Sequence, residues 1–271
     1  MISSFRTTII LCLCALPASA LEPPPFPDEL RVGVLFLGEI HDNPQHKQLM
    51  RDAMERIQPR AVVWEMLSPA EAEKVTKAFD KDGFLEALSH LDLDSFEWPN
   101  LKSYTPVFDA GYFQPHYGAH VPRSEMGQVR EMGVTAYFGT EADQFGLSNP
   151  LDSEEQAMRE EQQQVNHCNA LPPEILPFMV SIQRLRDATL ARVALRAFDE
   201  TGGPVVVVTG NGHARVDWGA PVYLRSARPG VTTASMGFVE DAAAAPPFSH
   251  TVETAPIERD DPCLAFKSQA D

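Results

Sequence analysis

Two short motifs place an acid or a base directly after apolar segments of strand length. Gly38-Glu39-Ile40-His41 follows the apolar run 32–37, and Gly210-Asn211-Gly212-His213 follows the valine run 205–208. Another carboxylate, Glu65, lies at the end of the apolar run 61–66. Residues two apart in an extended chain point to the same side, so Glu39 and His41 can share one cavity. We therefore expect a cleft that contains two carboxylates and two imidazoles.

Such a set of side chains supports two kinds of chemistry. In the first, Glu65, His41 and His213 are ligands of zinc, manganese or iron, and Glu39 is the base for a metal-bound water. In the second, no metal is needed, and His41 activates water against an ester or amide. A partner carboxylate can hold a buried histidine near the pKa that a general base needs. The His-Glu-x-x-His signature of metallopeptidase helices is absent from the sequence.

Alternating strand and helix patterns predict how these side chains are positioned. Pro44 opens an apolar pattern of helical spacing that ends before Pro59, and Ser68 to Glu71 has the form of a capping box for a helix over 68–79. Strand, helix, strand and helix in succession are typical of a parallel sheet with right-handed crossovers. Ligands of such sheets bind at the carboxyl ends of the strands. We predict an α/β fold with a mostly parallel central sheet flanked by helices and a smaller helical subdomain.

The remaining patterns complete this prediction. We expect one α/β domain over 31–271, with a helical insertion around 81–120 and 140–180. The expected helices cover 84–91, 124–132, 152–170 with Ser153 as a cap, and 173–200. The expected short strands cover 134–138, 221–225, 232–239 and 248–254, and a third strand end is expected near Val121-Pro122-Arg123.

The N-terminus predicts export. Residues 1–20 have the layout of a secretory signal peptide, and a proline-rich lead-in follows over 21–30. The mature chain is then soluble in the periplasm or outside the cell, without a membrane span. It retains Cys168 and Cys263, which form either one disulfide or two free buried thiols. The formal net charge of −16 argues against nucleic acid as a partner.

Several motifs, taken together, resemble those of a known family. The chain resembles the ChaN-like haem-binding uptake proteins of the Tiki superfamily. The motifs that carry the likeness are Gly38-Glu39-Ile40-His41-Asp42-Asn43-Pro44, Trp64-Glu65-Met66, Tyr104-Thr105-Pro106, Val121-Pro122-Arg123, the segment 183–191, Gly210-Asn211-Gly212-His213 and Asp261-Pro262-Cys263. The resemblance implies a site of Glu39, His41, Glu65 and His213, with Arg123, Gln183, Asp187 and Asn211 as ligand-binding residues. His120 departs from the family pattern, in which we expect an asparagine before the Pro-Arg pair.

The resemblance leaves two functions open. The first is an exported protein that binds haem for iron uptake, with Tyr104 and either His116 or His120 as candidate ligands of the haem iron. The second is a metal-dependent hydrolase, because the Tiki proteases and erythromycin esterase-like enzymes of the same superfamily use a related Glu/His site. Haem or another small molecule is the expected partner, and the sequence leaves open whether two chains form a homodimer around it.

Overall fold

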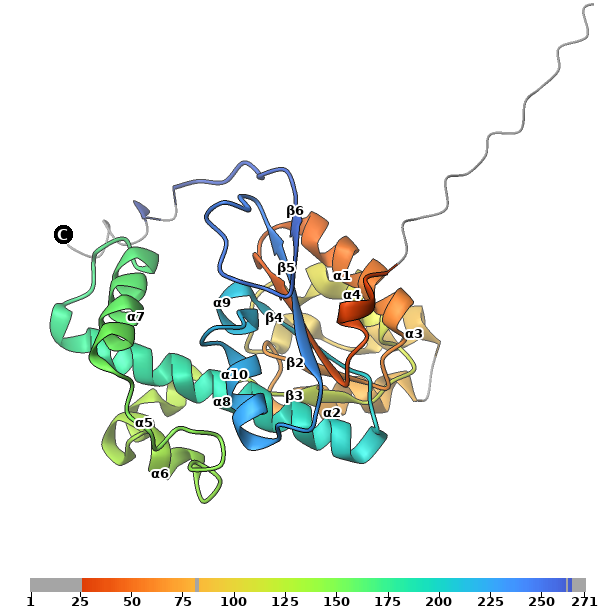
Figure 1. Ribbon diagram of the computed structural model, residues 1–271. Coiled ribbons are helices and arrows are strands. Elements are labelled where there is room, and N and C mark those ends of the chain that lie inside the picture. Colours follow the sequence, from red (N-terminus) through yellow and green to blue (C-terminus); the bar gives the residue numbers. More distant parts are fainter. Residues whose placement is uncertain (1–25, 81–82, 262, 265–271) are drawn as a thin grey trace, which may run out of the picture.

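The centre of the fold is a six-stranded sheet in which every pairing is parallel (Figure 1). The computed structural model describes residues 26–80, 83–261 and 263–264, so the predicted signal peptide and residues 21–25 of the lead-in lie outside the described residues. The strands are β1 (Val34–Glu39), β2 (Ala61–Trp64), β3 (His116–Gly118), β4 (Val205–Gly210), β5 (Thr233–Val239) and β6 (His250–Glu253). Their order is β3-β2-β4-β1-β5-β6. The predicted α/β fold with a parallel sheet is confirmed.

The central strands β1, β2 and β4 are buried on both faces because helices cover both sides of the sheet. In β4, Val205 and Val207 pack into one hydrophobic core, whereas Val206 and Val208 pack into the other. The first core includes α8 (Leu176–Thr201) and α10 (Ala220–Ala227). The second includes α1 (Pro44–Ile57), α2 (Pro69–Phe79) and α4 (Thr105–Ala110). This arrangement explains the continuous apolar runs, since a strand covered on both faces has no solvent-facing side.

Local sequence signals set the ends of the helices that follow the strands. Asn43 accepts a hydrogen bond from the backbone N–H of Gln45 and caps α1, and Pro44 occupies the first helical position. Ser68 and Glu71 form the predicted capping box of α2. Gly202, in a left-handed conformation with φ of 76°, ends α8. The chain therefore leaves β1 and β2 through short turns, and these turns carry the candidate site.

Shorter helices complete the structure. They are α3 (Phe84–His90), α5 (Met126–Met132), α6 (Val134–Phe138), α7 (Ser153–Asn166) and α9 (Asn211–Ala214), and the 3-10 turns η1 (Asp28–Leu30), η2 (Leu93–Ser95), η3 (Leu101–Tyr104), η4 (Arg123–Glu125) and η5 (Pro173–Ile175). Figure 1 shows α5, α6 and α7 grouped around the first half of α8, on the side away from α1. α3 and α4 instead pack against the sheet through the second core.

Two expected strands are helices. Val134–Phe138 is α6, which lies between Gly133 and Gly139, both with positive φ, and buries Phe138. The segment 221–225 belongs to α10, whose first turn contains Pro221 and which buries Tyr223 and Leu224. Both predictions were wrong because a short apolar run has no reliable period, so a helix and a strand cannot be told apart from it. The predicted cap of α7 was also displaced by one residue: Asp152 rather than Ser153 caps the N-terminus of this helix.

A disulfide joins two segments that are far apart in the sequence. Cys168, just after α7, is bonded to Cys263 near the C-terminus, across a sequence separation of 95 residues. Figure 1 shows the C-terminal segment crossing from the end of β6 to the end of α7. Within the described residues, no helix is long and apolar enough to cross a membrane.

Candidate functional site

The carboxyl ends of the three central strands meet at one edge of the sheet. In the register of β1 and β4, Glu39 lies beside Gly210, and β2 ends at Trp64 beside Val208. Glu65 therefore follows directly at the same level. The chain then turns into α1, α2 or α9, because an apolar strand cannot continue past these polar residues. The result is a cluster in which two histidines contact Glu65.

Glu65 is the centre of this cluster. Its Oε2 accepts hydrogen bonds from Thr209 Oγ1 at 2.6 Å and from the N–H of Gly210 at 2.7 Å. Nε2 of His213 lies 3.5 Å from Oε1, and Nε2 of His41 lies 4.0 Å from Oε2. Burial alone would raise the pKa of Glu65, but the two imidazoles and the two hydrogen bonds outweigh it and lower the pKa to about 2. Glu65 is therefore an anion at neutral pH.

His213 has a second carboxylate on its other ring nitrogen. Asp187, which is fully buried on α8, lies with Oδ1 2.6 Å from His213 Nδ1, and Gln183 Nε2 lies 3.1 Å from the same nitrogen. Burial lowers the pKa of His213, but the charges of Glu65 and Asp187 outweigh burial and raise it overall. Burial raises the pKa of Asp187. The i, i+4 spacing of Gln183 and Asp187 thus directs both side chains at one imidazole, as expected for neighbours on a helix face.

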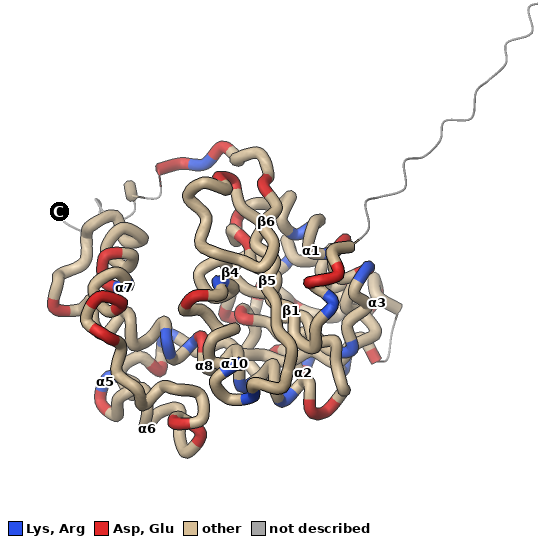
Figure 2. The backbone as a smooth tube through the Cα atoms, viewed as in Figure 1, with Lys and Arg blue, Asp and Glu red and all other residues tan. Residues whose placement is uncertain are grey.

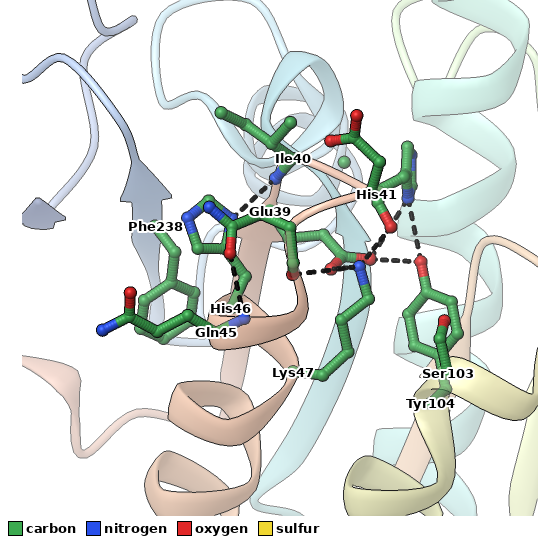
Figure 3. A network of polar contacts seen from close by, with 12 residues as sticks. Glu39, Ile40, His41, Gln45, His46, Lys47, Ser103, Tyr104 and Phe238 are labelled. Atoms are coloured by element: carbon green, nitrogen blue, oxygen red, sulfur yellow. Dashed lines mark hydrogen bonds and ion pairs between the residues drawn. The ribbon is translucent and has the colours of Figure 1, made fainter. Parts of the chain in front are cut away.

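His41 is held in a similar way on the other side of Glu65 (Figure 3). Its Nδ1 lies 3.1 Å from Glu39 Oε1 and 3.0 Å from the hydroxyl oxygen of Tyr104. Lys47 forms an ion pair of 2.8 Å with the other oxygen of Glu39 and donates to the carbonyl of His41. Burial lowers the pKa of His41, but the hydrogen bond to Glu39 and the charges of Glu65 and Glu39 raise it overall. The cluster therefore alternates acid and base, in the order Glu39, His41, Glu65, His213 and Asp187.

Two cavities open beside this array and share His41 and Glu65. The first, which we call the Trp98 cleft, has a volume of about 550 Å³. It is lined by His41, Asp42, Glu65, Glu97, Trp98, Pro99, Asn100, Ser103, Tyr104, Ala119, His120, Val121, Arg123, Arg186 and Leu190. The ring of Trp98 packs against His41 at 5.1 Å and against His120 at 5.7 Å. Its volume is within the range of about 300–1,000 Å³ that is usual for small-molecule sites.

The second cavity, which we call the His213 groove, has a volume of about 1090 Å³. It lies between α7, α8, α9 and the loop 244–247, and its lining is rich in polar side chains such as Gln163, Gln183 and Arg215. Arg259 from the C-terminal segment borders it and forms ion pairs with Asp42 and Glu240. The C-terminal segment thereby contributes to the wall of this groove.

A comparison with known protein families identifies the family of the chain. The family described as haem-binding uptake, Tiki superfamily, ChaN matches residues 30–224 of the chain. The chain belongs to this family. No curated protein sequence matches the chain.

One of the similar solved structures shows that the fold is shared. One solved structure is described as cofacial heme binding to ChaN of Campylobacter jejuni, and its sequence is 21% identical to that of this chain. The match covers 77% of this chain and 82% of the Campylobacter jejuni chain, with a TM-score of 0.54. The structure of a mutant of the erythromycin esterase EreC, in its open conformation, has a sequence that is 13% identical. This match covers 89% of this chain and 81% of the EreC chain, with a TM-score of 0.42. The type III effector HopBA1 is 11% identical in sequence, and the match covers 82% of this chain and 88% of the HopBA1 chain, with a TM-score of 0.42.

The structure brings most of the predicted residues of this ChaN-family chain to the two cavities. Tyr104, His120 and Arg123 line the Trp98 cleft, and Gln183 and Asn211 line the His213 groove. The amide nitrogen of Asn211 donates to the carbonyl of Phe238. His116 lies elsewhere, because it is buried in the core, where its Nδ1 accepts a hydrogen bond from the indole of Trp64 at 2.8 Å.

The predicted metal ligands do not surround a common point. Among the described residues, no three His, Cys, Asp or Glu side chains are grouped in a way that could hold a metal ion. His41 and His213 instead approach Glu65 with their Nε2 atoms, and both have raised pKa values. Because the described side chains offer no grouped set of ligands, the arrangement does not fit a resident divalent metal.

Three residues that the sequence reasoning did not single out complete the site. Lys47 lies beneath His41, and His46 accepts a hydrogen bond from the N–H of Ile40 at 3.0 Å, which fixes the turn after β1 (Figure 3). Arg186 lines the Trp98 cleft from α8. Lys47 and His46 lie in the first turn of α1, directly after the motif, and this proximity is the signal that could have identified them.

Proposed function

We propose that this chain is an exported haem-binding protein of iron uptake and that haem occupies the Trp98 cleft. The observation that carries the proposal is a cleft of about 550 Å³, with apolar walls and imidazoles, in a chain of the ChaN family. Trp98, Val121 and Leu190 supply apolar surface for the porphyrin faces. A related solved structure is described as cofacial heme binding, which supports the same ligand class for this chain.

His120 is the residue that best fits the haem iron. Its buried Nε2 forms no hydrogen bond in the part of the chain that the structure describes, although Glu97 Oε1 lies 3.4 Å away, and its ring borders the cleft beside Trp98. Bound haem supplies an iron centre that accepts such a nitrogen. Tyr104 fits less well than expected from sequence. Its hydroxyl donates to Glu39, and burial, followed by the charge of Glu39, raises its pKa, so the hydroxyl stays protonated.

The proposed location is the periplasm or the outside of the cell. The signal-peptide layout of residues 1–20 supports export, and so does the disulfide between Cys168 and Cys263, because disulfides persist in oxidising compartments. A fusion of residues 1–30 to a reporter that is active only after export tests this part of the proposal. Retention of the reporter in the cytoplasm would contradict it.

Titration of the mature chain with hemin tests the binding function. We expect a saturable, shifted Soret band for the wild type and a changed band position in His120→Ala. His250→Ala is the matched control, because this histidine lies on β6 and does not line the cleft. The absence of a saturable response in the wild type would overturn the proposal. A change in Tyr104→Phe alone would assign the iron to Tyr104, and the mass of the hemin complex decides whether a homodimer forms.

The acid-base array supports a second candidate, a hydrolase that needs no metal. His41 and His213 each have a carboxylate near Nδ1 and face Glu65 with Nε2. This arrangement can hold protons at two points that flank one anion, which suits proton transfer to a leaving group. Turnover of nitrophenyl esters or a peptide library that is lost in His41→Ala, in metal-free buffer, would favour this candidate. Unchanged turnover in His41→Ala would exclude it.

A further inference from the structure

Two arginines in the Trp98 cleft form no ion pair with any carboxylate in the described part of the chain. Arg123, in η4, and Arg186, on α8, both line the cleft. Neither guanidinium forms a hydrogen bond or an ion pair within the residues that the structure describes, although most other arginines of the chain pair with a carboxylate or a carbonyl. The two groups are close enough that Arg123 lowers the pKa of Arg186, although burial of Arg186 is the larger cause.

The acidic residues of the same cleft lie closer to other basic side chains than to these two arginines. Asp42 forms an ion pair with Arg259 at 2.9 Å, and Glu97 lies 3.4 Å from His120. Glu65 lies between His213 and His41. Its charge also acts on Arg186, but at a distance at which no ion pair forms. Among the described residues, neither Arg123 nor Arg186 therefore has an ion-pair partner in the cleft, although Glu65 and Asp187 act on Arg186 from farther away.

This local excess of positive charge is unusual for the molecule as a whole. The chain has 38 acidic and 22 basic residues, and Figure 2 shows acidic positions along α7 and in the loops around the sheet. Carboxylates are thus abundant, yet none of those in the described ranges forms an ion pair with either guanidinium. Two like charges that are partly withdrawn from water repel each other, and a bound anion relieves this repulsion. Guanidinium groups bind planar carboxylates through paired N–H donors.

We infer that Arg123 and Arg186 form a carboxylate-binding site on the wall of the Trp98 cleft. The ligand is an apolar ring system with one or two carboxylates, because the apolar side chains of Trp98 and Leu190 line the same cleft. The inference rests on the proposed haem-binding function, for which the carboxylates are the two propionates. Arg123 and Arg186 then set the orientation of the ring, whereas His120 contacts its centre.

Hemin and hemin dimethyl ester, which lacks the propionate charges, test this site by equilibrium titration. We expect the wild type to bind hemin about tenfold more tightly than the ester, or more, which corresponds to the loss of one hydrogen-bonded charge pair. In Arg123→Gln and Arg186→Gln the affinity for hemin falls toward that for the ester, and the affinity for the ester stays unchanged. Arg196→Gln is the matched control, because Arg196 lies on the same helix but not in the cleft.

The outcomes separate this site from the haem proposal. Equal binding of hemin and its ester by the wild type overturns the arginine site and leaves haem binding intact. If neither porphyrin binds, the haem proposal fails, and naphthoate is compared with naphthamide by ligand-observed NMR. A preference for naphthoate that is lost in Arg186→Gln supports the site, and the absence of a preference overturns it.

Discussion

Replacement of Glu65 by glutamine removes the central charge of the acid-base array and keeps its size. The pKa of Glu65 is about 2 in the folded chain, compared with an ordinary value of 4.5. Each pKa unit corresponds to about 1.4 kcal/mol, so the ionised carboxylate contributes about 3 kcal/mol to the free energy of unfolding at pH 7. Because the folded pKa is the lower one, this contribution is fully present above pH 4.5 and is lost as the pH falls toward 2. We expect the Glu65→Gln variant to lack this contribution to the free energy of unfolding at every pH.

Urea unfolding at a series of pH values between 3 and 8 measures this effect. The wild type should be more stable than Glu65→Gln by about 3 kcal/mol at pH 7, and the difference should shrink below pH 4.5. The histidine signals in NMR spectra give a second measure. His41 and His213 lose the anion that raises their pKa values, so both pKa values should fall in the variant. The stability that these histidines contribute is present below pH 6.5 and is lost as the pH rises.

Glu97→Gln is the matched control, because Glu97 lines the same cleft but has a side chain that is 46% exposed. Its removal should change the free energy of unfolding by less than about 1 kcal/mol, as for other exposed ion pairs. If Glu65→Gln were as stable as the wild type with the same pH profile, the two imidazoles would not be charged partners of Glu65. The alternating array would then be wrong.

Three other substitutions test the supports of the site. Gly210→Ala places a Cβ 2.7 Å from Nε2 of His41 and should displace that ring. We expect the pKa of His41, measured by NMR, to fall. An unchanged spectrum would contradict the close contact between Gly210 and His41. Lys47→Met removes the lysine that pairs with the buried carboxylate of Glu39 and should cost about 3–5 kcal/mol in urea unfolding, whereas a cost below 1 kcal/mol would refute the ion pair. Cys263→Ser opens the bond to Cys168 and should cost about 4 kcal/mol. Reductant should destabilise the wild type but not this variant.

The sequence predicted the parallel sheet and the meeting of its strand ends. The valines of β4 and the apolar run of β1 indicated strands covered on both faces, and both have this burial. The glycine motifs that follow them indicated where the chain turns. Because parallel strands present their carboxyl ends at one edge, Glu39, Glu65 and His213 could be placed together before any distance was known.

The parts that could not be predicted depend on contacts between distant segments. The pairing of Arg259 with Asp42 joins residues 217 positions apart, and no local pattern indicates it. The same holds for Arg186, because only the fold reveals that it lines the Trp98 cleft without an ion pair to any described residue. His116 and His120 look alike in the sequence, but the direction in which β3 ends places one in the core and the other at the cleft.

The position of Trp98 gives the cleft a fluorescent reporter of its own. The chain has three tryptophans, of which Trp64 is fully buried in the core and Trp218 packs between Arg159 and Arg215. Trp98 alone packs against His41. Its ring also contacts His120, so in a chain with Trp64→Phe and Trp218→Phe the emission intensity would respond to changes at both imidazoles. The occupancy and the ionisation of the cleft could thus be read from one optical signal, without a label.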